Sequence, residues 1–203
     1  TMLEFGLVDY KQPNNCVVEH MTWADDEAYQ KTLTSKYRYS LRKEILKYSD
    51  RFEVSYEKPT TELEKRACFE LYKNVFDKSH EMNVFELPYT LFEMMYDDPN
   101  YDIIRLYLKG SHDPVAVLFS HKNGAMYNAM LVGLNYEFVR EHNTYKQILY
   151  QSVVRAKALG CSTLDLAFTA EMEKKKVGAS IHENYAFVQA TEHLSYAILE
   201  TIQ

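Results

Sequence analysis

Thr144 and Gln147 stand three residues apart at the start of an apolar periodic segment, in the pattern T-x-x-Q. This spacing is typical of a capping box, which begins a helix. The first turn of a helix has backbone N–H groups without intrahelical acceptors, and such groups bind phosphate. We therefore expect a phosphate or pyrophosphate site at this turn, with Lys146, Arg140 and His142 as its neighbours.

The elements that must position this turn form a strand–helix–strand unit. Residues 125–132 are apolar and lie between two glycines, which predicts a short strand. The helix that begins at Thr144 keeps one apolar face until Gly160, which suits a left-handed residue after the helix. Residues 162–168 alternate as a second strand, and residues 171–178 predict a short helix. The arrangement predicts a βαβ unit with a right-handed crossover.

The rest of the chain predicts three more helices and several strands. Thr22 begins a long helical segment with acidic residues in its first turn, Thr61 and Glu64 form a second capping box, and Pro88 suits the first turn of a third helix. Residues 16–20 can add a short strand from outside the sheet. Five further strands are predicted, at residues 52–57, 102–109, 114–121, 184–190 and 193–200. The last two of them form a hairpin.

Composition excludes several classes of protein. The chain has 203 residues, 46% hydrophobic and 26% charged, which suits one globular domain. Three scattered cysteines and seven histidines without metal-type spacing argue against a metal site. No apolar run approaches ~18 residues and no secretory signal is visible, so we expect a soluble cytoplasmic protein without membrane insertion.

The charge is acidic overall but basic in one segment. A net charge of −6 argues against general nucleic-acid binding. Seven basic residues nevertheless lie between Lys31 and Arg51, against two acidic ones. Such a run is usually the solvated face of a helix, and the alternative is a surface that holds an anionic ligand or tRNA.

Three antiparallel strands before a βαβ unit resemble the GNAT N-acyltransferase fold. Two motifs and the segment K-Y-R-x-x-L-R at residues 36–42 make the chain similar to the FemAB/FemX-like branch of that superfamily, over roughly residues 22–200. The motif Y-x-x-[LI]-L-Y-x-x-[IV]-x-x-A-x-x-x-G is formed by Tyr145, Ile148, Leu149, Tyr150, Val153, Ala156 and Gly160. The motif D-L-x-x-T-A-x-x-x-K-x-x-x-G is formed by Asp165, Leu166, Thr169, Ala170, Lys174 and Gly178.

The resemblance implies an α+β fold, a central mixed and mostly antiparallel sheet flanked by helices with an N-terminal helical extension. We expect residues 1–21 to be an N-terminal extension and residues 22–203 to be a single acyltransferase domain. The chain begins with threonine, which leaves room for a longer multidomain parent. Residues 140–147 lack the glycine-rich loop that lets the backbone of most GNAT enzymes approach the CoA pyrophosphate, and the FemX-like branch lacks this loop too.

The resemblance also implies chemical roles. Acyl transfer to an amine requires deprotonation of the ammonium, polarisation of the carbonyl and protonation of the leaving group. Tyr127 and Asn128 lie on opposite faces of their strand, so only one of them can face the ligand and polarise the carbonyl. Tyr145 can be the general acid or a packing residue, and Asp165 can be a base or fix a loop. Lys174 can hold a phosphate or carboxylate, or belong to a solvated basic turn. The expected cofactor-binding residues are Thr144, Lys146, Gln147 and Lys174.

Three functions are compatible with these features. The first is an N-acyltransferase that moves an acyl group from acyl-CoA, with acetyl-CoA as the expected co-substrate, to the amine of a small molecule or amino acid. The second is a FemX-like aminoacyl or peptidyl transferase that uses charged tRNA and a cell-wall precursor. The third is a non-catalytic binding module of a larger enzyme, for which Glu171 and Glu173 in the second motif leave room.

Overall fold

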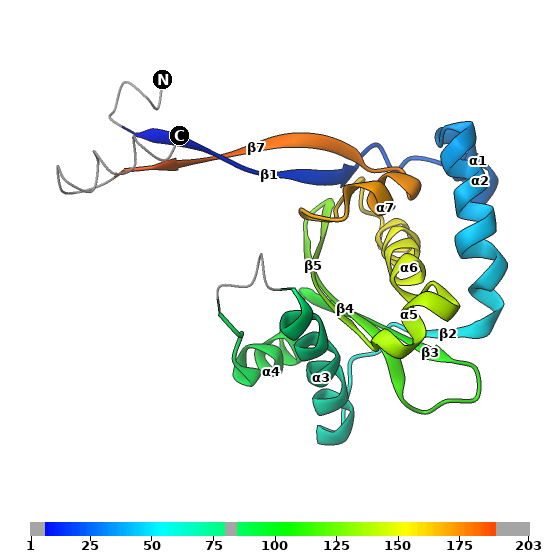
Figure 1. Cartoon of the computed structure of the whole chain (residues 1–203), viewed down its shortest axis with the longest axis vertical. Helices are drawn as coiled ribbons and strands as arrows, with labels where there is room; N and C mark the ends of the chain where they lie inside the picture. Colours follow the sequence, from blue (N-terminus) through cyan, green and yellow to red (C-terminus); the bar gives the residue numbers. More distant parts are fainter. Residues whose placement is uncertain (1–6, 80–84, 190–203) are drawn as a thin grey trace.

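The computed structural model describes residues 7–79 and 85–189. Within these ranges the chain forms one mixed sheet of seven strands flanked by helices (Figure 1), which confirms the predicted α+β fold. The strands are β1 (Val8–Val18), β2 (Phe52–Ser55), β3 (Tyr101–Leu108), β4 (Pro114–Asn123), β5 (Met126–Leu134), β6 (Thr163–Asp165) and β7 (Ser180–Val188). The α-helices are α1 (Asp26–Thr32), α2 (Ser35–Ser40), α3 (Glu62–Lys78), α4 (Tyr89–Asp97), α5 (Tyr136–His142), α6 (Thr144–Ala158) and α7 (Glu171–Lys176). A π-helical turn η2 (Leu41–Ile45) and a 3-10 helix η3 (Leu46–Arg51) follow α2.

The sheet has the order β2-β3-β4-β5-β6-β1-β7. The strands from β2 to β5 pair antiparallel with their neighbours, and β5 pairs parallel with β6. The helix α6 provides the crossover between the two parallel strands, so the predicted βαβ unit is confirmed. Strand β1 lies between β6 and β7 and is antiparallel to both, so residues before 22 contribute to the same sheet.

The two faces of the sheet carry different hydrophobic clusters. Strand residues alternate between faces, so Ile103 and Val117 pack with α3 and α4, whereas Ile104 and Leu118 pack with α6 and the α1–η2 segment. Figure 1 shows α3 and α4 on one side of β3–β5 and α6 on the other. The middle of the sheet therefore lies between two layers of helices.

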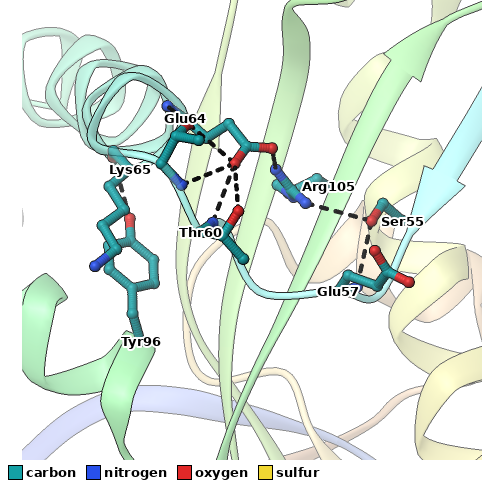
Figure 2. A network of polar contacts seen from close by, with 8 residues as sticks. Ser55, Glu57, Thr60, Glu64, Lys65, Tyr96 and Arg105 are labelled. Carbon is teal, nitrogen blue, oxygen red and sulfur yellow. Dashed lines mark hydrogen bonds and ion pairs between the residues drawn. The ribbon is translucent and has the colours of Figure 1, made fainter.

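A polar network fastens the first turn of α3 to the sheet (Figure 2). The predicted capping box between Thr61 and Glu64 is present. One oxygen of Glu64 accepts from the backbone N–H groups of Thr60 and Thr61 at 3.0 and 3.1 Å, and the other accepts from Nη1 of Arg105 on β3 at 2.9 Å. Since Arg105 is only 5% exposed, the network anchors α3 to a buried cation.

Two predicted elements differ from the structure, and a third lies partly outside the described residues. The long helix from Thr22 is wrong, because α1 begins at Asp26 and the extended residue Leu33 separates it from α2. The second parallel strand covers only Thr163–Asp165 instead of residues 162–168. Strand β7 pairs with β1 along its length, and the predicted hairpin partner at residues 193–200 lies outside the described residues.

Candidate active-site cleft

The parallel strands β5 and β6 separate after three paired residues. Pairing of β5 with β6 ends at Asn128 and Asp165, whereas the residues after Asp165 continue to bond to β1 on the other side. The N–H of Leu166 donates to the Cys16 carbonyl at 2.8 Å, and the Cys16 N–H donates to the Ala167 carbonyl at 3.0 Å. Strand β5 also has a register shift opposite Phe119 and Ser120. The two strands therefore diverge toward their carboxyl ends.

A cavity of about 270 Å³ occupies this divergence. Side chains from both helical layers line it, α3 on one face of the sheet and α6 on the other. They are Tyr72, Val75 and Phe76 from α3, Ser79 at the C-cap of α3, Tyr145, Ile148 and Leu149 from α6, Leu118 from β4, residues 129–132 from β5, residues 166–169 and Lys174. The walls are mostly apolar, and this described lining contains no carboxylate and no imidazole. A small number of polar groups in an apolar cavity is typical of a small-molecule site.

The loop that follows β6 is held in an unusual conformation. Ala167, Thr169 and Ala170 have φ values of 57°, 67° and 47°, in the left-handed region that non-glycine residues seldom adopt. The β-branched side chain of Thr169 makes this conformation especially costly, on the order of 1–3 kcal/mol. The Asp165 carboxylate accepts from the Ala167 N–H at 2.7 Å and from Asn15 Nδ2 at 3.1 Å. Surrounding contacts therefore impose the loop geometry at one wall of the cavity.

Lys174 completes this restraint from α7. Its side chain is not part of a solvated turn, since the residue is only 4% exposed and lines the cavity. The amino nitrogen Nζ donates to the Phe168 carbonyl at 2.5 Å and to the Ala167 carbonyl at 3.3 Å. Burial lowers the pKa of Lys174, and Cys16 and Asp165 oppose that shift.

The first turn of α6 differs from the predicted capping box. Asn143, in the left-handed region with a φ of 54°, is the N-cap, and its side chain makes no capping hydrogen bond. The Thr144 hydroxyl donates to the Phe138 carbonyl at 2.9 Å, and Gln147 Nε2 donates to the Ile45 carbonyl at 2.6 Å. Both residues are buried, and these hydrogen bonds tie α6 to α5 and η2. Their predicted role in cofactor binding stays a prediction. The capping-box prediction failed because buried tertiary contacts use the same residue types as a cap.

Lys146 and Tyr145 lie in the same turn with different surroundings. Lys146 Nζ pairs with Glu44 at 2.7 Å, and Lys176 pairs with the same carboxylate at 3.0 Å. Burial opposes ionisation of Glu44, but these hydrogen bonds lower its pKa to about 2. Tyr145 lines the cavity, and burial, with a smaller effect from Glu173, raises the pKa of its phenol. The phenol is therefore protonated at neutral pH.

Tyr127, Asn128 and Asp165 are not among the residues that line the cavity. The fully buried Tyr127 donates to Asp102 at 2.6 Å, and Arg155 binds the same carboxylate with two hydrogen bonds. Asn128 Nδ2 donates to the His121 carbonyl at 3.2 Å. The structure thus brings Tyr145 and Lys174 to one cavity and leaves the other three beside it, so their catalytic roles stay predictions.

Sequence reasoning missed the contribution of α3 to the cavity. Tyr72, Val75, Phe76 and Ser79 recur at helical spacing, which indicates a packed face and gives no sign of a ligand site. A usable signal was Gly133 on β5. A Cβ there would lie 2.6 Å from backbone atoms of α3, so glycine permits the close approach that makes this wall.

An exposed basic surface leads to the first turn of α6. It consists of Lys36, Lys43, Lys47 and Arg51, all exposed, on the α2–η3 segment. The cations of Lys43 and Arg51 lie over the rings of Tyr39 and Tyr48 at 5.4 and 4.7 Å. Arg51 Nη1 also lies 3.4 Å from Nδ1 of His142, next to the α6 N-cap. The basic surface therefore ends beside the candidate active site.

The described part of the chain holds no group of three His, Cys, Asp or Glu side chains arranged for a metal ion. Among the same residues, no helix has both the length and the apolar composition of a membrane span.

Comparisons with known proteins identify the family and support the fold. A family model described as acetyltransferase (GNAT) domain matches residues 35–175. No curated protein sequence matches the chain. The solved structure of FemX superposes with a TM-score of 0.68 at 11% identity, covering 94% of this chain and 65% of that one. L-PGS from Bacillus licheniformis superposes with a TM-score of 0.66 at 13% identity, covering 98% of this chain and 67% of that one. A GCN5-related N-acetyltransferase from Sphaerobacter thermophilus superposes with a TM-score of 0.54 at 11% identity, covering 92% of this chain and 53% of that one. The chain thus spans about two thirds of FemX and L-PGS.

Proposed function

Since the chain belongs to the acetyltransferase (GNAT) domain family, we propose that it is an N-acyltransferase with an acyl-CoA donor. The acceptor is the amine of a small molecule or amino acid. Its fold is the GNAT fold in its FemX-like form. The observation that carries the proposal is the cavity between β5 and residues 166–169, beside the first turn of α6.

The backbone around this cavity suits an acyl donor with amide groups. From Ala129 onward β5 pairs with β4 on one side and has no strand partner on the other within the described structure. An extended ligand with amides, such as the pantetheine arm of CoA, can hydrogen-bond to such an open strand edge. Ligands of open α/β sheets bind beyond the carboxyl ends of the strands, and that is where this cavity lies.

The α6 turn gives the donor two further contacts. The N–H groups of its first three residues have no acceptor within the helix, so the turn favours a phosphate of the donor. Tyr145 extends from the same turn into the cavity with a protonated phenol. When the amine attacks the thioester carbonyl, the C–N bond forms and the C–S bond breaks, and the phenol supplies a proton to the leaving thiolate.

A binding assay and a product assay test this proposal. A donor at a hundred times its Kd adds about 2.7 kcal/mol to the free energy of unfolding, which raises Tm by about 5–10 °C for a chain of this size. We expect acetyl-CoA or a longer acyl-CoA to produce this shift, and mass spectrometry to detect acylated amines from a panel of acceptors. The cleft variant Ala129→Phe should abolish both signals, and Met126→Phe, outside the cavity, should keep them. No shift with any CoA at millimolar concentration would overturn the acyl-CoA assignment.

The basic surface favours a second candidate, aminoacyl transfer from charged tRNA to a cell-wall precursor. The FemX-like fold and the cations that lead to the α6 turn support it, while the net charge of −6 opposes it. If the chain uses charged tRNA, the double substitution Lys43→Glu and Lys47→Glu should weaken tRNA binding and reduce the dependence of that binding on salt concentration. Transfer from aminoacyl-tRNA without any CoA signal would select this candidate. Ligand binding without transfer from either donor would select a non-catalytic module.

A further inference from the structure

Acylation of an amine at this cavity needs a base. An acceptor amine arrives mainly as an ammonium ion at neutral pH, and its nitrogen has no lone pair until one proton is removed. The described lining residues offer no carboxylate and no imidazole for this task. Their ionisable groups are Lys174 and the phenols of Tyr72 and Tyr145, and the Tyr145 phenol is protonated.

The contacts of Lys174 Nζ leave room for a neutral amine. A neutral lysine amine has two N–H donors and one lone pair, whereas an ammonium has three donors and no lone pair. Nζ uses two donors, one on the Ala167 carbonyl and one on the Phe168 carbonyl. Its remaining direction carries the lone pair if the amine is neutral. Since Lys174 lines the cavity at 4% exposure, that direction is shielded from bulk water.

Among the described residues, the charged and titratable groups around Lys174 leave it without a tight ion pair. From β1 it faces the thiol of Cys16, and from β6 it faces Asp165, whose oxygens already accept from Ala167 N–H and Asn15. On its own helix, Lys176 pairs with Glu173 at 2.9 Å and Lys175 lies 3.9 Å from Glu171. Burial therefore acts on Lys174 without a dedicated carboxylate to hold its charge, and its pKa is lowered.

We propose that Lys174 is the general base of the acyl transfer, in place of the anion-holding cation expected from the sequence. This role rests on the proposed acyltransferase function. The lone pair of Nζ takes one proton from the acceptor ammonium, and Lys174 becomes an ammonium held by the two loop carbonyls. The freed amine attacks the donor carbonyl, the C–N bond forms and the C–S bond breaks. The nitrogen of the new amide loses its second proton as the C–S bond breaks. Tyr145 protonates the leaving thiolate and is reprotonated, through water, by that second proton, and Lys174 releases the first proton to water. The strained loop at 167–170 thus places the base.

Two substitutions separate a base from a permanent cation. Lys174→Arg keeps a positive charge but cannot accept a proton at neutral pH, and Lys174→Ala removes the nitrogen. We expect both to lower kcat/KM by at least about a hundredfold, within the range for a lost general base. Ethylamine added to Lys174→Ala should restore part of the rate, more so as the pH rises and more of it is unprotonated. The acidic limb of the wild-type pH–kcat/KM profile should be absent from Lys174→Ala without ethylamine.

Other outcomes of these assays would overturn the base assignment. Activity of Lys174→Arg within about threefold of wild type would make Lys174 an anion-binding cation. Equal losses in both variants without rescue, together with an unchanged acidic limb, would make it only a support of the loop. Lys175→Ala is the matched control, because Lys175 is adjacent on α7 and absent from the cavity lining, and it should stay near wild-type activity.

A measurement that keeps Lys174 in place leaves the proposal testable if the Lys174 variants do not fold. NMR titration of ε-¹³C-labelled lysine, with Lys175→Arg and Lys176→Arg used for assignment, follows the ionisation of each amine directly. We expect one buried lysine resonance to titrate below the others. A Lys174 resonance that stays protonated up to pH 10 would overturn its role as base. An absence of acyl transfer with every donor would instead overturn the proposed function, and the titration would still report on Lys174.

Discussion

The phenol of Tyr145 is the residue-scale feature that links fold to chemistry, because it extends from the first turn of α6 into the cavity. Tyr145→Phe removes one oxygen and leaves the apolar ring in place. If the phenol protonates the leaving thiolate, kcat should fall by about a hundredfold or more, while the donor Kd and Tm stay nearly constant. Steady-state kinetics with isothermal titration of the donor provide the measurement.

Tyr150→Phe is the control for this substitution. Tyr150 lies on α6 too, where it is buried, but it does not line the cavity. It should retain wild-type kcat. Comparable losses in kcat from both substitutions would show that α6 needs its phenols for packing, and Tyr145 would lose its assigned role.

Glu64 makes stability depend on pH at the α3 anchor (Figure 2). The Arg105 hydrogen bond, with backbone N–H groups of Thr61 and Thr60, lowers the pKa of Glu64 to about 2 in the folded protein, from 4.5. The folded state therefore binds fewer protons than the unfolded state between these values. The stabilisation is complete above pH 4.5 and is lost as pH falls toward 2.

Urea unfolding at pH 6 and pH 3 measures this contribution. Glu64→Gln should lower the free energy of unfolding at pH 6 by about 1–3 kcal/mol, because the buried Arg105 loses its charged acceptor. The difference from wild type should shrink at pH 3. Glu70→Gln, exposed on the same helix, should change little at either pH. A Glu64→Gln effect that is constant between the two pH values would contradict the assigned shift.

At the scale of elements, the distance between α3 and β5 sets the width of the cleft. In Gly133→Ala the new Cβ would lie 2.6 Å from the Leu71 carbonyl carbon and the Tyr72 nitrogen, both backbone atoms that cannot rotate away. Helix α3 must then shift, at a cost of about 1–3 kcal/mol. We expect a lower Tm and weaker donor binding, measured by calorimetry and titration.

The glycine at the β4–β5 turn is the comparison for this effect. Gly124 has a φ of 58° and nothing within 4 Å of a new Cβ. Gly124→Ala should therefore cost about 1 kcal/mol through backbone strain and leave donor binding intact. If Gly133→Ala keeps the wild-type donor Kd, the α3 wall does not shape the donor site.

At the scale of the whole molecule, the β1–β7 ribbon is the part that should open most easily. It extends beyond the rest of the sheet (Figure 1), and its aromatic residues Tyr10, Tyr185 and Phe187 are 48%, 43% and 48% exposed. A two-stranded ribbon without cover is marginally stable in water. Amides of residues 8–12 and 184–188 should exchange faster than those of residues 103–106 and 116–119 in hydrogen exchange followed by mass spectrometry. Equal slow exchange would mean that the ribbon is covered.

Local sequence patterns were sufficient for most of the elements. The Thr61–Glu64 cap, the left-handed Gly160 and the short helix α7 were predicted correctly, because each depends on residues within one or two helical turns. The parallel β5–β6 pair also followed from sequence, since a strand–helix–strand segment of this length has one favoured handedness. Tyr145 and Lys174, in the two motifs, were the candidates that the cavity contains.

Only the tertiary structure decided how the site is built. Gln147 resembles a capping residue in sequence but bonds to Ile45, a partner 102 positions away. The cleft exists because residues after Asp165 continue to bond to β1 but no longer pair with β5, and β1 is distant in sequence from both. Lys174, flanked by two other lysines, is indistinguishable from a solvated residue until its burial is known. Contacts between distant residues fix burial, hydrogen-bond partners and strand separation, and local periodicity contains no information about them.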